Sequence, residues 1–187
     1  MSGEKSTHVV YTLRPHGYHP ISFGGEIIPL KSSAKYLGVH LDERLTYRVH
    51  VETKRKELDL RIRKLHWLLH RASALSLSNK RLLYMAILRP VWAYALPIWE
   101  CATTSLRNVI QRFQNKALRL IAGASWYVRN DTLHADLSVP TIVGVIQQLS
   151  QKHERRLHSH PNDLALGLLD TIQTTRRLSR RHPVDQG

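Results

Sequence analysis

Apolar and polar positions follow two different periods along this chain, and the change between them falls near residue 45. Before it, residues 7–42 are rich in β-branched and aromatic side chains, which favours strands. Within this stretch Gly24 and Gly25 separate two short apolar runs, and adjacent glycines accept the positive φ angles of a tight hairpin turn. The first part of the chain therefore predicts antiparallel β structure.

The run KYLGVHLD has the alternation of a strand with one buried face, because Leu37, Val39 and Leu41 alternate with polar or small residues. Gly38 within this strand is expected to mark a bulge or a close approach of the backbone to another element. Asp42 and Glu43, the adjacent acids at the end of this run, cannot by themselves assemble a two-metal site, which needs carboxylates from separate strands. Asp42 is instead predicted to accept hydrogen bonds from the backbone N–H groups that start the next helix.

After residue 45 the period becomes that of helices. Apolar residues between about 47 and 71 fall in one sector at about 100° per residue and predict the buried stripe of a first helix. They are Val51, Leu58, Ile62, Leu65 and Leu69. A second helix, over residues 79–99, is apolar on all sides and is therefore expected at the centre of the fold. Ser78 is its predicted N-cap, and Pro90 should bend or end it.

The segment from about 105 to 122 is amphipathic without interruption, and Gly123 is the glycine expected just past a helix end. Its apolar positions are Leu106, Val109, Ile110, Phe113, Ala117, Leu120 and Ile121. A polar connection with one turn of helix follows, and Pro140 opens a last helix that runs to about residue 158. The basic segment 174–187 has no periodicity and is predicted to be disordered.

These elements predict an α+β fold that is mostly α, with a short antiparallel β-hairpin or sheet at the N-terminus followed by a helical bundle. Four regions are expected: a β region over residues 4–45, a helical region over 46–124, a connection and helix over 125–160, and a basic tail over 161–187.

Little in the sequence points to catalysis or to a metal. His66 and His70 have the i,i+4 spacing of two metal ligands on one helix face, but no third ligand is placed beside them. Cys101 is the single cysteine, which excludes a disulfide framework and fits a reducing compartment. The N-terminal residues hold no apolar run long enough for a signal peptide or a membrane span. We therefore expect an intracellular protein, nuclear or cytoplasmic and not secreted, with no catalytic residue, metal, cofactor or membrane partner of its own.

Charge favours a polyanionic partner. The chain has 28 Lys and Arg against 14 Asp and Glu, a formal net charge of +14. Cations gain by neutralising phosphates and releasing condensed counterions, an attraction that does not depend on sequence and weakens with salt. The alternative is a solvated basic surface, or a composition biased toward arginine.

Two rows of cations, termed ridges, are the candidate residues for binding such a partner. The first helix places Lys56, Leu60, Arg63 and Trp67 away from its core stripe, and the third places Arg112, Lys116 and Arg119 along one edge. Such ridges suit a phosphate backbone, and Trp67 could stack on a base or sugar. The alternative is that Trp67 packs on a neighbouring element and that the cations only face solvent. Replacing the three cations of the third helix should reduce the salt dependence of binding and leave the fold intact.

Three stretches then suggest a family. KYLGVHLDERLTYRVHV, SLSNKRLLYMAILRPVWAYALPIW and QRFQNKALRLIAGASWYVRNDTLHADLSVPTI, in this order, resemble the C-terminal part of reverse transcriptases from non-LTR retrotransposons of the jockey clade. The likeness covers roughly residues 4–160. It implies that KYLGVHLD is the primer-grip strand at the end of the polymerase palm, with Leu37 and Gly38 as the family's Leu-Gly pair. It also implies that Lys5 lies near the phosphates of the incoming nucleotide and that the helices form a thumb along the template–primer duplex.

The departures from this family bear on activity. Its catalytic carboxylates, among them an aromatic-Ala-Asp-Asp turn, have no match here, and HADL at 134–137 resembles that turn only superficially. Without metal ligands a polymerase cannot activate the primer hydroxyl. The resemblance therefore implies a fragment of an RNA-directed DNA polymerase that binds an RNA–DNA hybrid or duplex through its backbone. Mg²⁺ is expected only for a complete polymerase, in which palm and fingers would be further partners. The alternatives are an inert translated remnant of a mobile element or a basic nucleic-acid-binding module adopted by a host.

Overall fold

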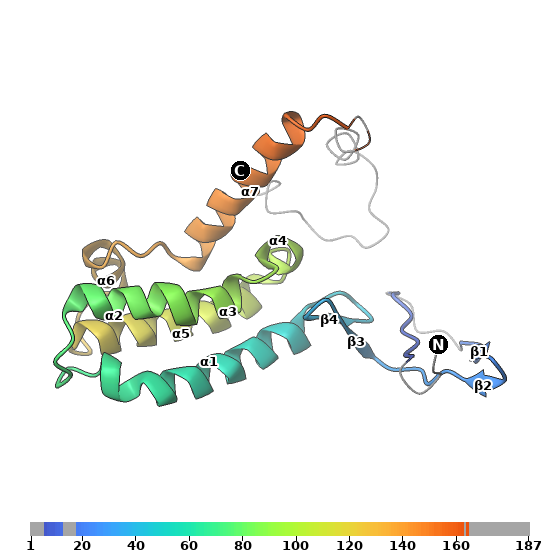
Figure 1. The fold of residues 1–187 in the computed structure, drawn as a ribbon, viewed down its shortest axis with the longest axis horizontal. Helices are drawn as coiled ribbons and strands as arrows, with labels where there is room; N and C mark the ends of the chain where they lie inside the picture. Colours follow the sequence, from blue (N-terminus) through green and yellow to red (C-terminus); the bar gives the residue numbers. More distant parts are fainter. Residues whose placement is uncertain (1–5, 13–17, 163, 165–187) are drawn as a thin grey trace.

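The computed structural model describes residues 6–12, 18–162 and 164, and it consists of two small β-hairpins followed by helices (Figure 1). The strands are β1 (Ser22–Phe23), β2 (Glu26–Ile27), β3 (Ser33–Tyr36) and β4 (Val39–Asp42). The helices are α1 (Arg48–Leu69), α2 (Leu77–Leu83), the π-helical η2 (Tyr84–Leu88), α3 (Arg89–Ala93), α4 (Leu96–Trp99), α5 (Thr104–Ala122), α6 (Asn130–Asp136) and α7 (Ile142–His158). The predicted α+β class, mostly α, is confirmed. Lys5 and the basic segment 174–187 lie outside the described residues.

The first hairpin forms at the predicted glycine pair. Strands β1 and β2 pair antiparallel across Gly24 and Gly25, whose φ angles of 61° and 85° lie in the region that glycine enters without steric cost. Upstream, the strand-like run that begins at residue 7 makes no strand within residues 6–12, where the structure has an isolated bridge between His8 and Leu30.

The prediction of one continuous strand through KYLGVHLD is wrong. The run folds back on itself, so that β3 and β4 are the two arms of an antiparallel hairpin. Leu37 and Gly38 form its tip with φ angles of 45° and 78°. Leu37, which the alternation placed on the buried face, is 73% exposed, whereas Val39 is buried. The expected close approach at Gly38 is confirmed, since a Cβ atom there would lie 3.1 Å from Cε1 of Tyr94.

Asp42 holds the turn that leads into the first helix, as predicted, although its bonds go to residues that precede α1. One carboxylate oxygen accepts from the Tyr47 N–H at 2.7 Å and the other from the Thr46 N–H at 3.0 Å. Burial tends to raise the pKa of the Asp42 carboxyl, but hydrogen bonds from Thr46 and Tyr47 outweigh it and lower the pKa. The buried stripe of α1 is also confirmed, with Leu65 half-buried against the core. His50, which the pattern missed, is fully buried beside this stripe.

The second helix differs from its prediction at both ends. Its N-cap is Ser76 and not Ser78, because the Ser76 hydroxyl accepts from the Asn79 N–H at 3.3 Å. This start brings the buried Lys80 to the end of α1, where its amine donates to the carbonyl oxygen of His70 at 2.8 Å. A π-helical turn directly precedes Pro90, which has no N–H to continue the α-helical ladder. The helix ends at Ala93, and α4 is a separate turn.

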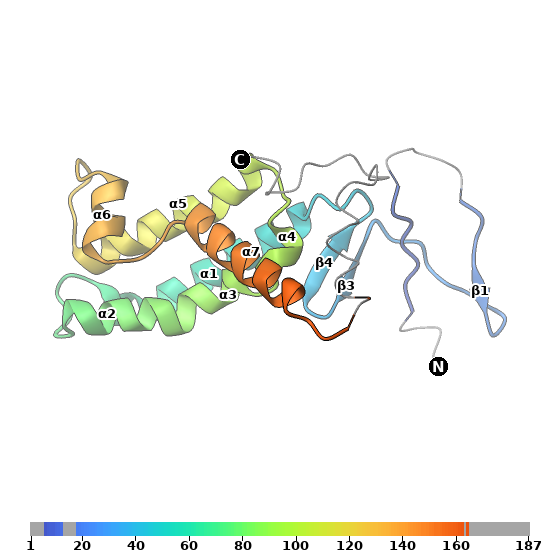
Figure 2. The same ribbon diagram turned by 90° about the horizontal axis from the view of Figure 1, so that it is seen from above.

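One cluster of buried residues forms the core and runs from Val39 to Ile146. Helices α1, α2, α3 and α5 lie alongside one another, and α7 leaves at an angle across α4 and α5 (Figures 1 and 2). The largest fully buried side chains are Trp92, Trp99, Tyr84 and Phe113. Gly123 ends α5 with a φ of 60°, and α7 begins after Pro140, both as predicted. The boundaries of the four regions stay predictions. In the described part of the chain, no helix has the length and apolar character that crossing a membrane requires.

Candidate nucleic-acid interface

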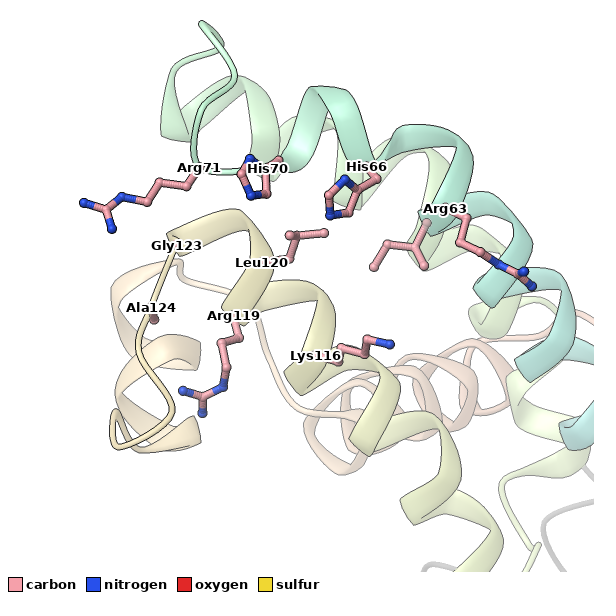
Figure 3. A pocket seen from close by; sticks show the side chains of 10 residues that line it. Arg63, His66, His70, Arg71, Lys116, Arg119, Leu120, Gly123 and Ala124 are labelled. Atoms are coloured by element: carbon pink, nitrogen blue, oxygen red, sulfur yellow. The ribbon is translucent and has the colours of Figure 1, made fainter.

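The last turns of α1 and α5 border an open hollow with a volume of about 550 Å³, termed the α1–α5 groove (Figure 3). Its lining from α1 and the residue after His70 is Ile62, Arg63, His66, His70 and Arg71, and its lining from α5 and the following loop is Lys116, Arg119, Leu120, Gly123 and Ala124. The groove exists because the apolar stripes of the two helices pack below it, which turns their polar edges toward each other. Figure 3 shows His66, His70 and Leu120 between the two helices.

Among the described residues, the groove lining includes cations, histidines and apolar side chains but no carboxylate. Two acids of α1 are paired with cations outside the lining: Glu57 with Lys54 and Arg61, and Asp59 with Arg55. Among the residues that the structure describes, no ion pair includes a cation of the groove lining. A concave surface with uncompensated positive charge attracts anions such as phosphate groups.

The two ridges predicted from the sequence meet at this groove. Arg63 of α1 and Lys116 of α5 both line it, although 53 positions separate them in the chain. Lys56, two turns before Arg63, and Arg112, one turn before Lys116, are exposed and continue the two edges beyond the lining. Trp67 is 72% exposed and outside the groove lining, so most of its side chain does not pack on a neighbouring element as the alternative supposed. Nucleic-acid binding by these residues stays a prediction.

Arg119 has a second role that the sequence did not indicate. Its guanidinium donates to the carbonyl oxygens of Ser125 and Val128, the latter at 2.8 Å, and to the side-chain oxygen of Asn130 at 3.0 Å. It therefore holds the loop between α5 and α6 while it lines the groove. These bonds argue against the expectation that Arg119 can be replaced together with Arg112 and Lys116 at no cost to the fold.

Sequence reasoning missed three groove residues. His66 and His70 follow Arg63 at i+3 and i+7, so helical spacing places all three on one face of α1. The predicted ridge instead continued from Arg63 to Trp67. Their rings lie 5.1 Å apart between centroids. Arg71 had no periodic signal because it follows the end of α1; it lies against Gly123, where a Cβ atom would be 3.2 Å from its Cγ. In the described part of the chain, no group of three or more His, Cys, Asp or Glu residues could hold a metal ion.

Leu37 and Gly38 are not part of this groove. The tip they form lies beside the start of α1, whereas the groove lies at its end (Figure 1). A helix of 22 residues is about 33 Å long, so roughly this length separates the two places. Strand β4 of the hairpin is held by His50, whose Nδ1 accepts a 3.4 Å hydrogen bond from the His40 N–H. Burial, together with the charges of Lys54 and His40, lowers the pKa of His50 to about 4.

Comparison with known proteins finds relatives that match most of this chain. It is 42% identical over 185 residues to a probable RNA-directed DNA polymerase from transposon X-element of Drosophila melanogaster. The aligned region covers 99% of this chain and 20% of that protein. It is 39% identical over 162 residues, 87% of this chain and 18% of the relative, to one from transposon BS of the same species. This chain is homologous to part of several RNA-directed DNA polymerases of Drosophila transposons and mobile elements, jockey among them.

The resemblance predicted from the motifs is thereby confirmed. A third relative, the RNA-directed DNA polymerase from mobile element jockey of Drosophila funebris, is 36% identical over 97% of this chain and 21% of its own length. The chain thus spans about a fifth of the length of the relatives it matches. No protein-family model matches it, and no solved structure does.

The motif WYVRNDTLHADLSVPTI has a structural role in this chain. His134 lies on α6, and its Nδ1 donates to the carbonyl oxygen of Val139 at 2.7 Å. Its Nε2 lies 3.0 Å from the side-chain oxygen of Asn115 on α5. Gln111 of α5 in turn accepts from the Ile142 N–H at 2.9 Å, at the start of α7. HADL therefore belongs to the contact that docks α6 and α7 on α5.

Proposed function

We propose that this segment binds the template–primer nucleic acid of an RNA-directed DNA polymerase and that the α1–α5 groove holds its phosphate backbone. The observation that carries this proposal is the convergence of Arg63 and Lys116, from two helices, on a hollow lined by no carboxylate. The relatives are named as RNA-directed DNA polymerases, which supports a nucleic-acid ligand.

Binding would depend on shape and charge more than on base sequence. Cations at the groove contact phosphate oxygens, and counterions released from the backbone supply the free energy. Lys56 and Arg112 extend the two edges and lengthen the track along the duplex. The length of α1, about 33 Å, matches roughly ten base pairs at about 3.4 Å each. A duplex lying along α1 would then reach from the groove to Leu37 and Gly38, which we propose as the contact to the primer end.

We further propose that catalysis, and the Mg²⁺ that it needs, belong to other parts of the complete polymerase. RNA-templated DNA synthesis would be the activity of that longer protein, in the nucleus or the cytoplasm of the cell. Primer extension by the purified 187-residue chain, with a primed RNA template, Mg²⁺ and nucleotides, tests this directly. Incorporation above that of a heat-denatured control would contradict it.

The β-hairpins would contact the palm and fingers of such a protein. Phe23, Ile27 and Tyr36 are exposed apolar side chains gathered at this end of the chain. Exposed apolar residues of this kind mark interaction surfaces or aggregation-prone patches. Replacing Phe23 and Ile27 with Ser is expected to raise the solubility of the isolated chain without changing its melting temperature. An unchanged solubility would remove the support for this contact.

A salt titration tests the binding proposal. The affinity for a fluorescently labelled RNA–DNA hybrid should fall linearly with salt on a double-logarithmic plot. The variant carrying Arg63→Ala and Lys116→Ala should lower the magnitude of the slope by about two, one for each phosphate that a cation no longer neutralises. The matched control removes two exposed cations of α7, Lys152→Ala and Arg155→Ala, and should leave the slope close to that of the unchanged chain. An affinity that does not respond to salt, or an equal reduction in the control, would exclude the groove as the binding site.

A further inference from the structure

Two aromatic rings stand out from the loop between α5 and α6. Trp126 is 87% exposed and Tyr127 is 72% exposed. Their ring centroids are 6.0 Å apart in an edge-to-face arrangement. Two adjacent large aromatic side chains in solvent forfeit the free energy that burial would supply, so their exposure calls for a ligand.

The loop that carries them is held in place. Arg119 donates to the carbonyl oxygens of Ser125 and Val128, the residues on either side of the aromatic pair. The Val128 N–H donates to the Ser125 carbonyl oxygen at 3.2 Å and closes a turn around the pair, and the Val128 side chain packs on the core. The rings are therefore presented by a backbone fixed at both ends, which lowers the entropic cost of binding a ligand to them.

The aromatic pair adjoins the α1–α5 groove. Ala124 lines the groove, and Trp126 follows two positions later, so their Cα atoms lie within about 7 Å of each other. Figure 3 shows the loop leaving Gly123 and Ala124 beside Arg119, which belongs to the groove and to the loop at once. A nucleic acid whose phosphates occupy the groove would thus have its next nucleotide at the rings.

We propose that Trp126 and Tyr127 form a stacking site for an unpaired base, next to a duplex whose backbone lies in the α1–α5 groove. This inference rests on the proposed function and adds the single-stranded part of the ligand to it. Stacking of a base on an aromatic ring is tolerant of sequence, because every base has a π face. Single-stranded nucleic acids are typically bound by this combination of a cationic track with aromatic side chains.

The surroundings of the pair favour a nucleotide over a protein partner. The residues that follow on α6, Asn130, Asp131 and Thr132, are polar and exposed, so the apolar surface is limited to the two rings. Protein-docking patches on soluble proteins are larger and continuous. The cations beside the loop match the negative charge of a nucleic acid.

The experiment compares three labelled RNA–DNA hybrids: one with blunt ends, one with a four-nucleotide single-stranded overhang, and one with an overhang of the same length that lacks bases. The last two carry equal charge, so any difference between them measures the bases alone. The unchanged chain should bind the overhang with bases at least about fivefold more tightly than the overhang without them. The variant Trp126→Ala with Tyr127→Ala should lose this difference and bind the blunt hybrid as before.

Two matched variants serve as controls. Trp126→Phe keeps an aromatic face and should retain most of the difference between the overhangs. Tyr36→Ala removes an exposed aromatic ring from the β3–β4 hairpin and should retain all of it.

The outcomes separate this inference from the proposed function. If the blunt hybrid binds with the expected salt dependence but both overhangs bind equally, the stacking site is wrong and the groove stands. If the blunt hybrid does not bind, the proposed function fails. If the double Ala variant keeps the difference between the overhangs and instead loses self-association in sedimentation velocity, the rings are a protein contact and the inference is overturned.

Discussion

The hydroxyl of Tyr94 donates a hydrogen bond to the carbonyl oxygen of Leu37, with 2.6 Å between the two oxygens. The bond joins the tip of the β3–β4 hairpin to the residue that follows α3, 57 positions further along the chain. The amine of Lys54 lies over the same tyrosine ring, 5.7 Å from its centroid. Tyr94 therefore fixes the tip of the hairpin relative to the helices, and His50 holds its strand β4.

Gly38→Ala should destabilise the fold by about 1–2 kcal/mol, because the alanine backbone would have to keep the positive φ of Gly38. Its methyl group would also lie 3.1 Å from Cε1 of Tyr94. Urea denaturation measures the change in the free energy of unfolding. Made in a Tyr94→Ala chain, the same substitution should cost less, because only the backbone strain remains. An equal cost in both chains would show that the ring contact does not matter.

Asp42→Asn should lower the free energy of unfolding by about 1 kcal/mol at neutral pH. The carboxylate accepts hydrogen bonds from the N–H groups of Thr46 and Tyr47, directly before α1. Because the pKa of this carboxyl is lowered in the folded chain, its contribution is present above the ordinary value of 3.8 and is lost as the pH falls below it. The variant should therefore show a weaker loss of stability below about pH 4. Asp42→Ala, which removes the hydrogen-bond acceptors as well as the charge, should lower the free energy of unfolding further than Asp42→Asn does.

His50 should make stability depend on pH between about 4 and 6.5. Its folded pKa of about 4 lies below its ordinary value of 6.5, so the unfolded chain binds a proton there that the folded chain does not. Stability is complete above pH 6.5 and should decrease by on the order of 3 kcal/mol as the pH falls to 4.

Denaturation curves at several pH values test this dependence. His50→Gln, which keeps an acceptor for the His40 N–H without a titrating ring, should flatten the curve over this window. His66→Gln changes an exposed histidine of the same helix and serves as the control. A curve that is as steep in His50→Gln as in the unchanged chain would refute the assignment.

Arg119→Met should release the loop between α5 and α6. With its hydrogen bonds removed, at about 1 kcal/mol each, backbone amides of residues 124–129 should exchange with deuterium about fivefold faster or more. Arg119→Lys should behave similarly, because an ammonium group cannot reach several acceptors as the planar guanidinium does. Arg112→Met, on the same edge of α5, should leave the exchange unchanged. Equal exchange in all of these chains would mean that the loop is held by other interactions.

Much of the candidate site could be anticipated from local patterns, and some of it could not. The ridge on α1 and the edge of α5 followed from helical periodicity, which is a property of neighbouring residues. That Arg63 and Lys116 line one groove could not be read from either helix, because it depends on how the two buried stripes pack. Arg119 illustrates the same limit: its place on the edge was predictable, but its bonds to Ser125 and Val128 depend on the path of the loop.

The sequence by itself determined most of the helices, the turn at Gly24 and Gly25, the turn at Asp42 that precedes α1 and the resemblance to transposon polymerases. Each depends on side chains close together in the chain or on a linear motif. Only the tertiary structure decided that KYLGVHLD folds back, that His50 is buried and that two cationic ridges converge. Each of these outcomes needs an interaction between residues far apart in the chain, such as Leu37 with Tyr94. A short apolar run with a glycine satisfies a strand or a turn equally well until such an interaction selects one of them.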